Sequence, residues 1–320
     1  MLPASPTVLR HSLAAPKLRE GGCFGIPSMP HRTFSPARVF AIAGNTFTDL
    51  TRQRVFYVVL IFALVLIGSS VFLAQLSFQQ EFQILKDVSL GAISIFSSLL
   101  AIVATARLIP QEIEDHTVYT ILAKPVPRFE YLLGKLAGVL VLIALSTAIM
   151  GAMFFALIYW REHVVLEETA RQLSNGPREQ LDQALRSVRD SAVNADILPG
   201  IAIIYIKACL LAALTLFVST FATTNIFTIV VMVFVYFIGH LQATAREYWL
   251  QENGAGLIAR VFLAMVALIF PDLQAFNLVD QIVAGVAVPV ALFAKTALLG
   301  IFYTTIYTLL AIFVFYGKEL

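Results

Sequence analysis

Six stretches of the chain are apolar over about twenty residues or more, and this feature limits the possible folds more than any other. A helix needs about 20 mostly apolar residues to cross the ~30 Å hydrocarbon core of a bilayer. Of the 320 residues 59% are hydrophobic and only 13% are charged, against about 25% charged in a typical soluble domain. The sequence therefore predicts an all-α polytopic membrane protein with six transmembrane helices, at about 55–76, 88–108, 132–160, 201–222, 226–245 and 292–316.

A shorter apolar stretch, residues 257–270, precedes the last span and is ended by Pro271. As a helix its fourteen residues would rise about 21 Å, which is less than the hydrocarbon core. We interpret it as a short re-entrant or interfacial helix. Because another apolar segment follows it, a further span within residues 257–290 stays open.

The region before the first span divides into two parts. Residues 1–34 contain Pro, Ser and Arg but no continuous apolar segment, so they predict a disordered tail rather than a signal peptide, and Met29 is an alternative start. Residues 35–54 have apolar residues on one face and charged residues on the other, which predicts an amphipathic elbow helix on the membrane surface. The transmembrane permease domain would then occupy residues 55–320.

The distribution of basic residues predicts the sidedness of the chain, because Lys and Arg in short loops favour the cytoplasm. The region before the first span is rich in Arg and poor in acids, whereas residues 161–198 have more acids than Arg. The N- and C-termini are therefore expected in the cytoplasm. Residues 161–198 are expected outside it, as an extracytoplasmic helical hairpin with a turn at Asn175-Gly176.

Several kinds of active site are missing from the sequence. It has no phosphate-binding G-x-x-x-x-G-K-[ST] loop, no H-E-x-x-H and no G-x-S-x-G. No span centre has paired carboxylates, as a proton relay usually would. We therefore assign no catalytic residues, no metal site and no cofactor to this chain. A net charge of +2 gives no reason to expect nucleic acid as a partner.

The loop between the second and third spans is unusually charged and has a helical pattern. Pro110 suits a first helical position, and three acidic residues follow where the helix dipole favours negative charge. Lys124 lies in the last turn, and Pro125 ends the helix. This predicts a short cytoplasmic helix, residues 110–124, followed by a second helix that continues from Pro127 into the third span. The alternative is that these charges only keep the loop solvated.

The sequence of this loop resembles the cytoplasmic loop of type-2 ABC transporter permeases, in particular the multicopper-enzyme-maturation permease branch. The six-span layout and the elbow helix agree with this family. One departure is His116, where many relatives have Gly. The residues that carry the resemblance are Glu112, Glu114, Thr117, Leu122, Pro125, Val126, Arg128, Gly134 and Lys135.

The resemblance implies that residues 110–124 are a coupling helix, which docks on a separate ABC ATPase subunit. It implies a membrane-spanning permease subunit of an exporter in the bacterial cytoplasmic (inner) membrane, paired with a second permease copy as a homo- or heterodimer. ATP and Mg²⁺ would be bound by the ATPase, so this chain would not itself be an enzyme. The residues implied in ATPase coupling are Glu112, Glu114, Asp115, Thr117, Leu122, Pro125 and Arg128.

Two lysines within the apolar spans need a separate explanation. Lys207 and Lys295 each lie near the expected outer end of a span. They either extend to the membrane interface, as long cationic side chains commonly do, or line an outer cavity that attracts an anionic substrate or lipid headgroup. Gly134 and Gly138 form a small-xxx-small pair that permits close helix packing.

Two other functions are compatible with the same pattern. The chain could be an ATPase-driven membrane anchor or mechanotransmitter that acts on an extracytoplasmic assembly, which the predicted hairpin favours. It could also be an ion-coupled secondary carrier, against which the lack of acids in the spans argues. The substrate stays open among copper, sulfur species, lipids, peptides and drugs, and the transport direction follows from the resemblance alone.

Overall fold

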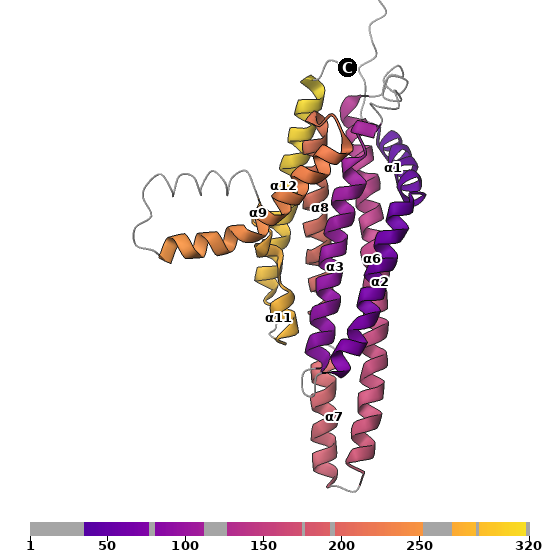
Figure 1. Ribbon diagram of the computed structural model, residues 1–320, viewed down its shortest axis with the longest axis vertical. Coiled ribbons are helices and arrows are strands. Elements are labelled where there is room, and N and C mark those ends of the chain that lie inside the picture. Colours follow the sequence, from indigo (N-terminus) through magenta and orange to yellow (C-terminus); the bar gives the residue numbers. More distant parts are fainter. Residues whose placement is uncertain are drawn as a thin grey trace, which may run out of the picture. The chain divides into compact units, whose positions relative to one another are not determined.

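The six predicted membrane spans are present as long apolar helices (Figure 1). The computed structural model describes residues 35–76, 81–111, 127–174, 177–192, 196–251, 271–285 and 288–317, without the side chains of 190 and 243–251. All of these residues belong to one of two compact units of the chain, Ser35–Leu320. The helices long and apolar enough to cross a membrane are α2 (Arg54–Gln75), α3 (Glu81–Ala106), α6 (Arg128–Gln172), α8 (Ile197–Phe221), α9 (Asn225–Gln251, apolar as far as Gln242) and α12 (Val290–Gly317).

Four shorter elements accompany the spans in the described part of the chain. The helix α1 (Pro36–Thr51) precedes the first span, and α7 (Arg178–Ala192) follows α6. A 3-10 turn, η1 (Gln274–Phe276), and the short helix α11 (Val279–Val283) lie before the last span. The location of α1 on a membrane surface stays a prediction, and the predicted helix at 257–270 and the tail at 1–34 lie outside the described residues.

The helices α3 and α8 form the centre of the packing. In their most apolar windows 61% and 67% of the residues are buried, against 22% in α2 and 28% in both α9 and α12. The helix α3 contacts α2, α6, α8 and α9. Among the described residues, α2, α9 and α12 leave most of their apolar windows exposed, which suits helices that face lipid or another subunit.

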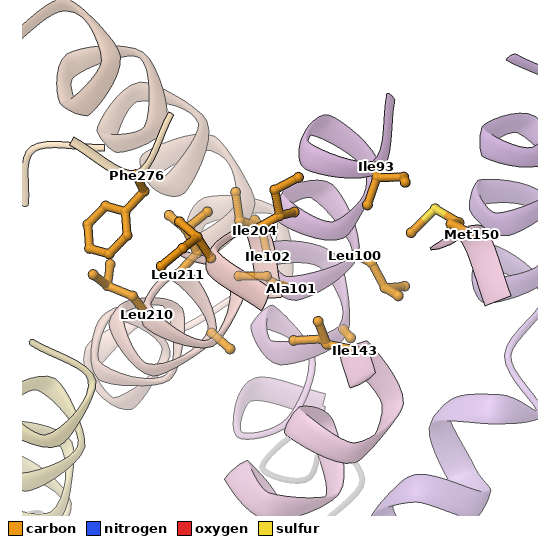
Figure 2. Close-up of a cluster of buried hydrophobic side chains, with 14 of the residues drawn as sticks. Ile93, Leu100, Ala101, Ile102, Ile143, Met150, Ile204, Leu210, Leu211 and Phe276 are labelled. Carbon is orange, nitrogen blue, oxygen red and sulfur yellow. The ribbon is translucent and has the colours of Figure 1, made fainter. Parts of the chain in front are cut away.

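Figure 2 shows how α3 fills the space between α6 and α8 with aliphatic side chains. One side of α3 lies towards α6, and the other lies towards α8. The labelled residues of α3 are Ile93, Leu100, Ala101 and Ile102; those of α6 are Ile143 and Met150; those of α8 are Ile204, Leu210 and Leu211.

The bundle has two distinguishable ends, which we call the α1 end and the α7 end after the short helix at each. At the α1 end, Arg107 after α3 donates to Gln53 before α2 at 3.4 Å. Arg128 at the beginning of α6 donates to the carbonyl of Tyr316 near the end of α12 at 3.1 Å. The loop from α3 to α6 therefore begins and ends at the α1 end.

The helix α6 is longer than the sequence predicts. It continues through Trp160 to Gln172 because residues 161–172 contain neither Gly nor Pro. Its 45 residues span about 68 Å, roughly twice the hydrocarbon thickness. The part beyond residue 160 is therefore continuous with the span, and α7 packs against it.

Two polar contacts fasten this extension at the α7 end. Buried Arg161 of α6 forms a 2.8 Å ion pair with Glu81 at the beginning of α3. The ammonium of Lys86 in α3 donates to the carbonyl of Ser191 in α7 at 2.7 Å. Since both contacts end on α3, the extension of α6 and α7 is tied to the central helix of the bundle.

Candidate functional site

The predicted coupling segment is bounded by two well-defined anchors at the α1 end. Described residues stop at Gln111 after α3 and resume at Pro127 before α6. Of the residues implied in ATPase coupling, only Arg128 is described. The others, Glu112, Glu114, Asp115, Thr117, Leu122 and Pro125, lie outside the described residues.

The beginning of α6 packs very closely against α1 through two glycines, which confirms the small-xxx-small prediction. A Cβ atom on Gly134 would lie 2.8 Å from the Cβ of Ile42, and one on Gly138 would lie 2.7 Å from the carbonyl oxygen of Ala43. Real Cβ contacts under 3.0 Å are essentially never seen. Glycine at both positions is therefore what lets the two backbones approach, and α1 is held directly on α6.

A buried carboxylate adds a polar fastening to the same contact. Glu130 has 0% exposure, and its Oε1 accepts the backbone N–H of Ser35 at 3.0 Å. Its Oε2 pairs with Arg38 at 3.5 Å. The acid also lies in the first turn of α6, where the helix dipole favours negative charge.

Glu130 was not identified as a site residue from the sequence. The available signal is a single acid just inside the beginning of an apolar span, with a basic residue in the preceding amphipathic helix. Only the packing of α1 on α6 shows that Arg38 and Glu130 meet.

The beginning of α6 is also tied to the end of α12. Besides the bond from Arg128 to the Tyr316 carbonyl, the guanidinium carbon of Arg128 lies 5.9 Å from the centre of the Tyr316 ring. One turn further along α6, Tyr131 stacks on Phe315 with ring centres 6.3 Å apart. Arg128 therefore connects the segment that follows Pro125 to the last membrane helix.

The anchor on the α3 side of the predicted coupling segment is short and well packed. Leu108 and Ile109, which follow α3, are 6% and 2% exposed. Arg107 reaches Gln53, in the turn between α1 and α2. Consequently a displacement of the segment between the anchors would reach α1, α2, α3, α6 and α12 through direct contacts. This arrangement offers mechanical transmission.

The two lysines singled out from the sequence occupy different environments. Lys295, near the beginning of α12, is exposed. Lys207 lies near the middle of α8, is 2% exposed and donates to the hydroxyl of Ser94 in α3 at 2.8 Å. Its ammonium therefore lies between helices inside the bundle. The interpretation in which Lys207 extends to the membrane–water interface would need an exposed ammonium.

Comparison with known proteins bears on the same region. Residues 47–173 match the family model described as ABC-2 family transporter protein. The matched residues run from within α1 past the end of α6, so they include the segment 112–126 and both of its anchors. This match covers less than half of the chain. No curated protein matches the sequence. The multicopper-enzyme-maturation branch stays a prediction.

Proposed function

We propose that this chain, an ABC-2 type transporter membrane subunit by its match over residues 47–173, is the permease of an ATP-driven exporter. A separate ATPase would bind ATP and Mg²⁺, and this chain would perform no covalent chemistry. The coupling helix would be residues 110–124, at a cytoplasmic α1 end. The observation that carries this proposal is that the acid-rich segment joins α3 to the beginning of α6, where α1 and α12 are also fastened.

The contacts at the α1 end suggest how such coupling would work. Closure of the ATPase on ATP would move residues 110–124. Because little slack separates them from α6, the beginning of that helix would move too and take α1 with it through Gly134 and Gly138. The spans would then exchange between inward-open and outward-open arrangements. A ligand is moved only if it binds the two arrangements with different affinities.

A second copy of the permease and membrane lipid are the other proposed partners. In the part of the chain that the structure describes, most residues in the apolar windows of α2, α9 and α12 are exposed. Lipid can cover such surface without loss, and helix pairing in a membrane can cover part of it. Whether the second copy is identical to this chain is a separate question.

Charge reversal in the predicted coupling helix tests the proposal. The variant replaces the acidic residues Glu112→Lys, Glu114→Lys and Asp115→Lys; a matched control replaces Glu162→Lys, Glu167→Lys and Glu168→Lys in the far part of α6. We expect the first variant to lose ATPase binding and stimulation by at least about tenfold, which is about 1.4 kcal/mol, because like charges would oppose at the contact. The control should retain both. If the first variant assembles with the ATPase as the parent chain does, residues 110–124 are not the coupling element.

A second candidate function is favoured by the rigid extension at the α7 end. The continuous helix α6 passes well beyond the length of a membrane span, and it is fastened to α3 through Arg161 and Glu81. Such an element could transmit movement of the bundle to an extracytoplasmic assembly. Truncation of residues 163–192 with a short linker distinguishes the two functions. An exporter would still respond to its substrate, whereas a mechanotransmitter would lose its function while its ATPase coupling persists.

A further inference from the structure

Lys207 is a buried basic residue at the centre of the membrane bundle. It lies near the middle of α8, and its two recorded contacts come from other helices near their middles as well. The ammonium donates to the Ser94 hydroxyl of α3 at 2.8 Å and lies 5.9 Å from the ring centre of Tyr236 in α9. Three spans thus converge on one amine at mid-depth.

The surroundings of this amine do not satisfy a positive charge. An ammonium group has three N–H donors, and in the described part of the chain Ser94 accepts one of them while no carboxylate forms an ion pair with Lys207. By contrast, buried Arg161 of α6 forms an ion pair with Glu81. Charged groups at this depth are costly, and those that persist commonly mark substrate or ion pathways.

Polar groups continue from Lys207 along α9. The ring of Tyr236 lies 4.3 Å from that of His240, centre to centre, and Nδ1 of His240 lies 3.0 Å from the carbonyl oxygen of Tyr236. The segment after Pro271 is held against α9 by a 3.1 Å hydrogen bond from the N–H of Leu273 to the carbonyl of Gly239. Tyr236 and His240 therefore continue the polar groups along α9 towards this segment.

The rest of the neighbourhood is apolar. On α8 the residues on either side of Lys207 in sequence include buried Ile203, Ile204, Leu210 and Leu211. A ligand that meets the ammonium here would place its remaining surface against aliphatic side chains. Such a site suits a molecule with one charged group on an apolar body.

We propose that Lys207 binds an anionic group of the transported molecule, a carboxylate, phosphate or sulfate on an apolar body, and that Ser94 and Tyr236 hold the ammonium when this group is absent. The proposal rests on the transport function proposed above and gives its substrate class. An anion would supply the strong acceptor that the described residues do not provide. The binding would require α9 to separate from α8, which fits a helix that buries little of its own surface.

The test measures binding to the purified full chain in phosphatidylcholine nanodiscs, so it does not depend on an ATPase. The probe is a fluorescent polyene fatty acid, and the comparison ligand is its methyl ester, which has the same chain without the charge. The variants are Lys207→Met, Lys207→Arg and Ser94→Ala, and the matched control is Lys295→Met at the exposed lysine. Thermal unfolding of each variant is recorded in parallel.

We expect the acid to bind at least about tenfold more tightly than the ester, a difference of about 1.4 kcal/mol. Lys207→Met should abolish this difference, while Lys207→Arg and Lys295→Met should keep it. Ser94→Ala removes the hydroxyl that competes with the ligand's anionic group for the ammonium of Lys207. The affinity for the acid should therefore stay equal or increase. Competition by phosphatidylglycerol as well as by dodecanoate would identify a phospholipid headgroup as the source of the anion; competition by dodecanoate alone would identify a free acid.

Two results would overturn the proposal. One is equal binding of acid and ester by the parent chain. The other is retention of the full preference by a folded Lys207→Met variant. If Lys207→Met does not fold, the acid-to-ester ratio of the parent chain and the direction of the Ser94→Ala effect still decide. A failure to recruit any ATPase would reject the transport function, but it would leave this measurement unchanged, so the two failures are distinguishable.

Discussion

A methyl group added at Gly138 should separate α1 from α6. The Cβ of Gly138→Ala would lie 2.7 Å from the carbonyl oxygen of Ala43 and 2.8 Å from the Cβ of Thr46. Ordinary van der Waals contact begins at 3.4 Å, so α1 would have to withdraw by about 0.7 Å. A gap of 0.5–1 Å loses roughly a quarter to a half of each dispersion contact along the interface.

The size of the effect follows from two opposing terms. Overpacking typically costs about 1–3 kcal/mol, and replacement of a helical glycine by alanine returns about 1 kcal/mol of helix propensity. The expected net destabilisation is therefore about 0–2 kcal/mol relative to the parent chain, and about 1–3 kcal/mol relative to a glycine-to-alanine change without the clash. Gly91→Ala in α3 is the matched control, because nothing lies within 4 Å of the added methyl group and only the favourable propensity term remains.

Thermal unfolding in mild detergent measures this difference, and backbone hydrogen exchange in α1 reports how firmly α1 is held on α6. Gly138→Ala should lower the unfolding midpoint relative to Gly91→Ala and speed hydrogen exchange in α1. Gly91→Ala should leave the midpoint equal or higher and the exchange in α1 unchanged. Equal midpoints for the two variants would refute the argument that close approach at Gly138 holds α1 in place.

Two further substitutions test the polar contacts at the two ends of the bundle. Glu130→Ala removes the buried acceptor for Arg38 and for the N–H of Ser35, so it should destabilise the chain by about 1–3 kcal/mol. The measurement is backbone hydrogen exchange in α1, which should be faster in Glu130→Ala than in the control variant Glu179→Ala at an exposed position. Arg161→Ala leaves Glu81 without its partner and should cost a similar amount, with the thermal midpoint as the readout. If the costs of Arg161→Ala and Glu81→Ala simply add in the double variant, the 2.8 Å ion pair contributes no coupling energy.

Much of the bundle follows from sequence pattern because a bilayer restricts the available structures. Backbone groups in hydrocarbon must be satisfied within the helix, so apolar stretches of sufficient length become spans. This explains why the six predicted spans are found among the described helices. The same logic does not fix where a helix ends outside the membrane. The helix α6 continues to Gln172 because no helix breaker lies between Trp160 and that residue. The hydropathy of the sequence does not reveal this continuation.

The candidate sites show a different limit of sequence reasoning. The spacing of Gly134 and Gly138 indicates that a helix can approach α6, but not that the helix is α1. Lys207 could be placed within a span, yet hydropathy cannot tell which side of α8 faces α3 and α9. Its bond to Ser94, 113 residues away in sequence, depends on the rotation of α8 in the assembled bundle. The contact between Glu130 and α1 likewise depends on how the helices pack.

We propose that this chain works with a separate ATPase, and isolation of the chain from its native membrane tests this most directly. The chain would be purified in mild detergent and its co-purifying proteins identified and quantified. We expect a stoichiometric ATPase with a Walker sequence, retained by the Glu162/Glu167/Glu168 control and lost from the Glu112/Glu114/Asp115 reversal. Isolation of the chain alone, under conditions that preserve a known ABC complex from the same membrane, would contradict the account and point instead to gradient-driven transport.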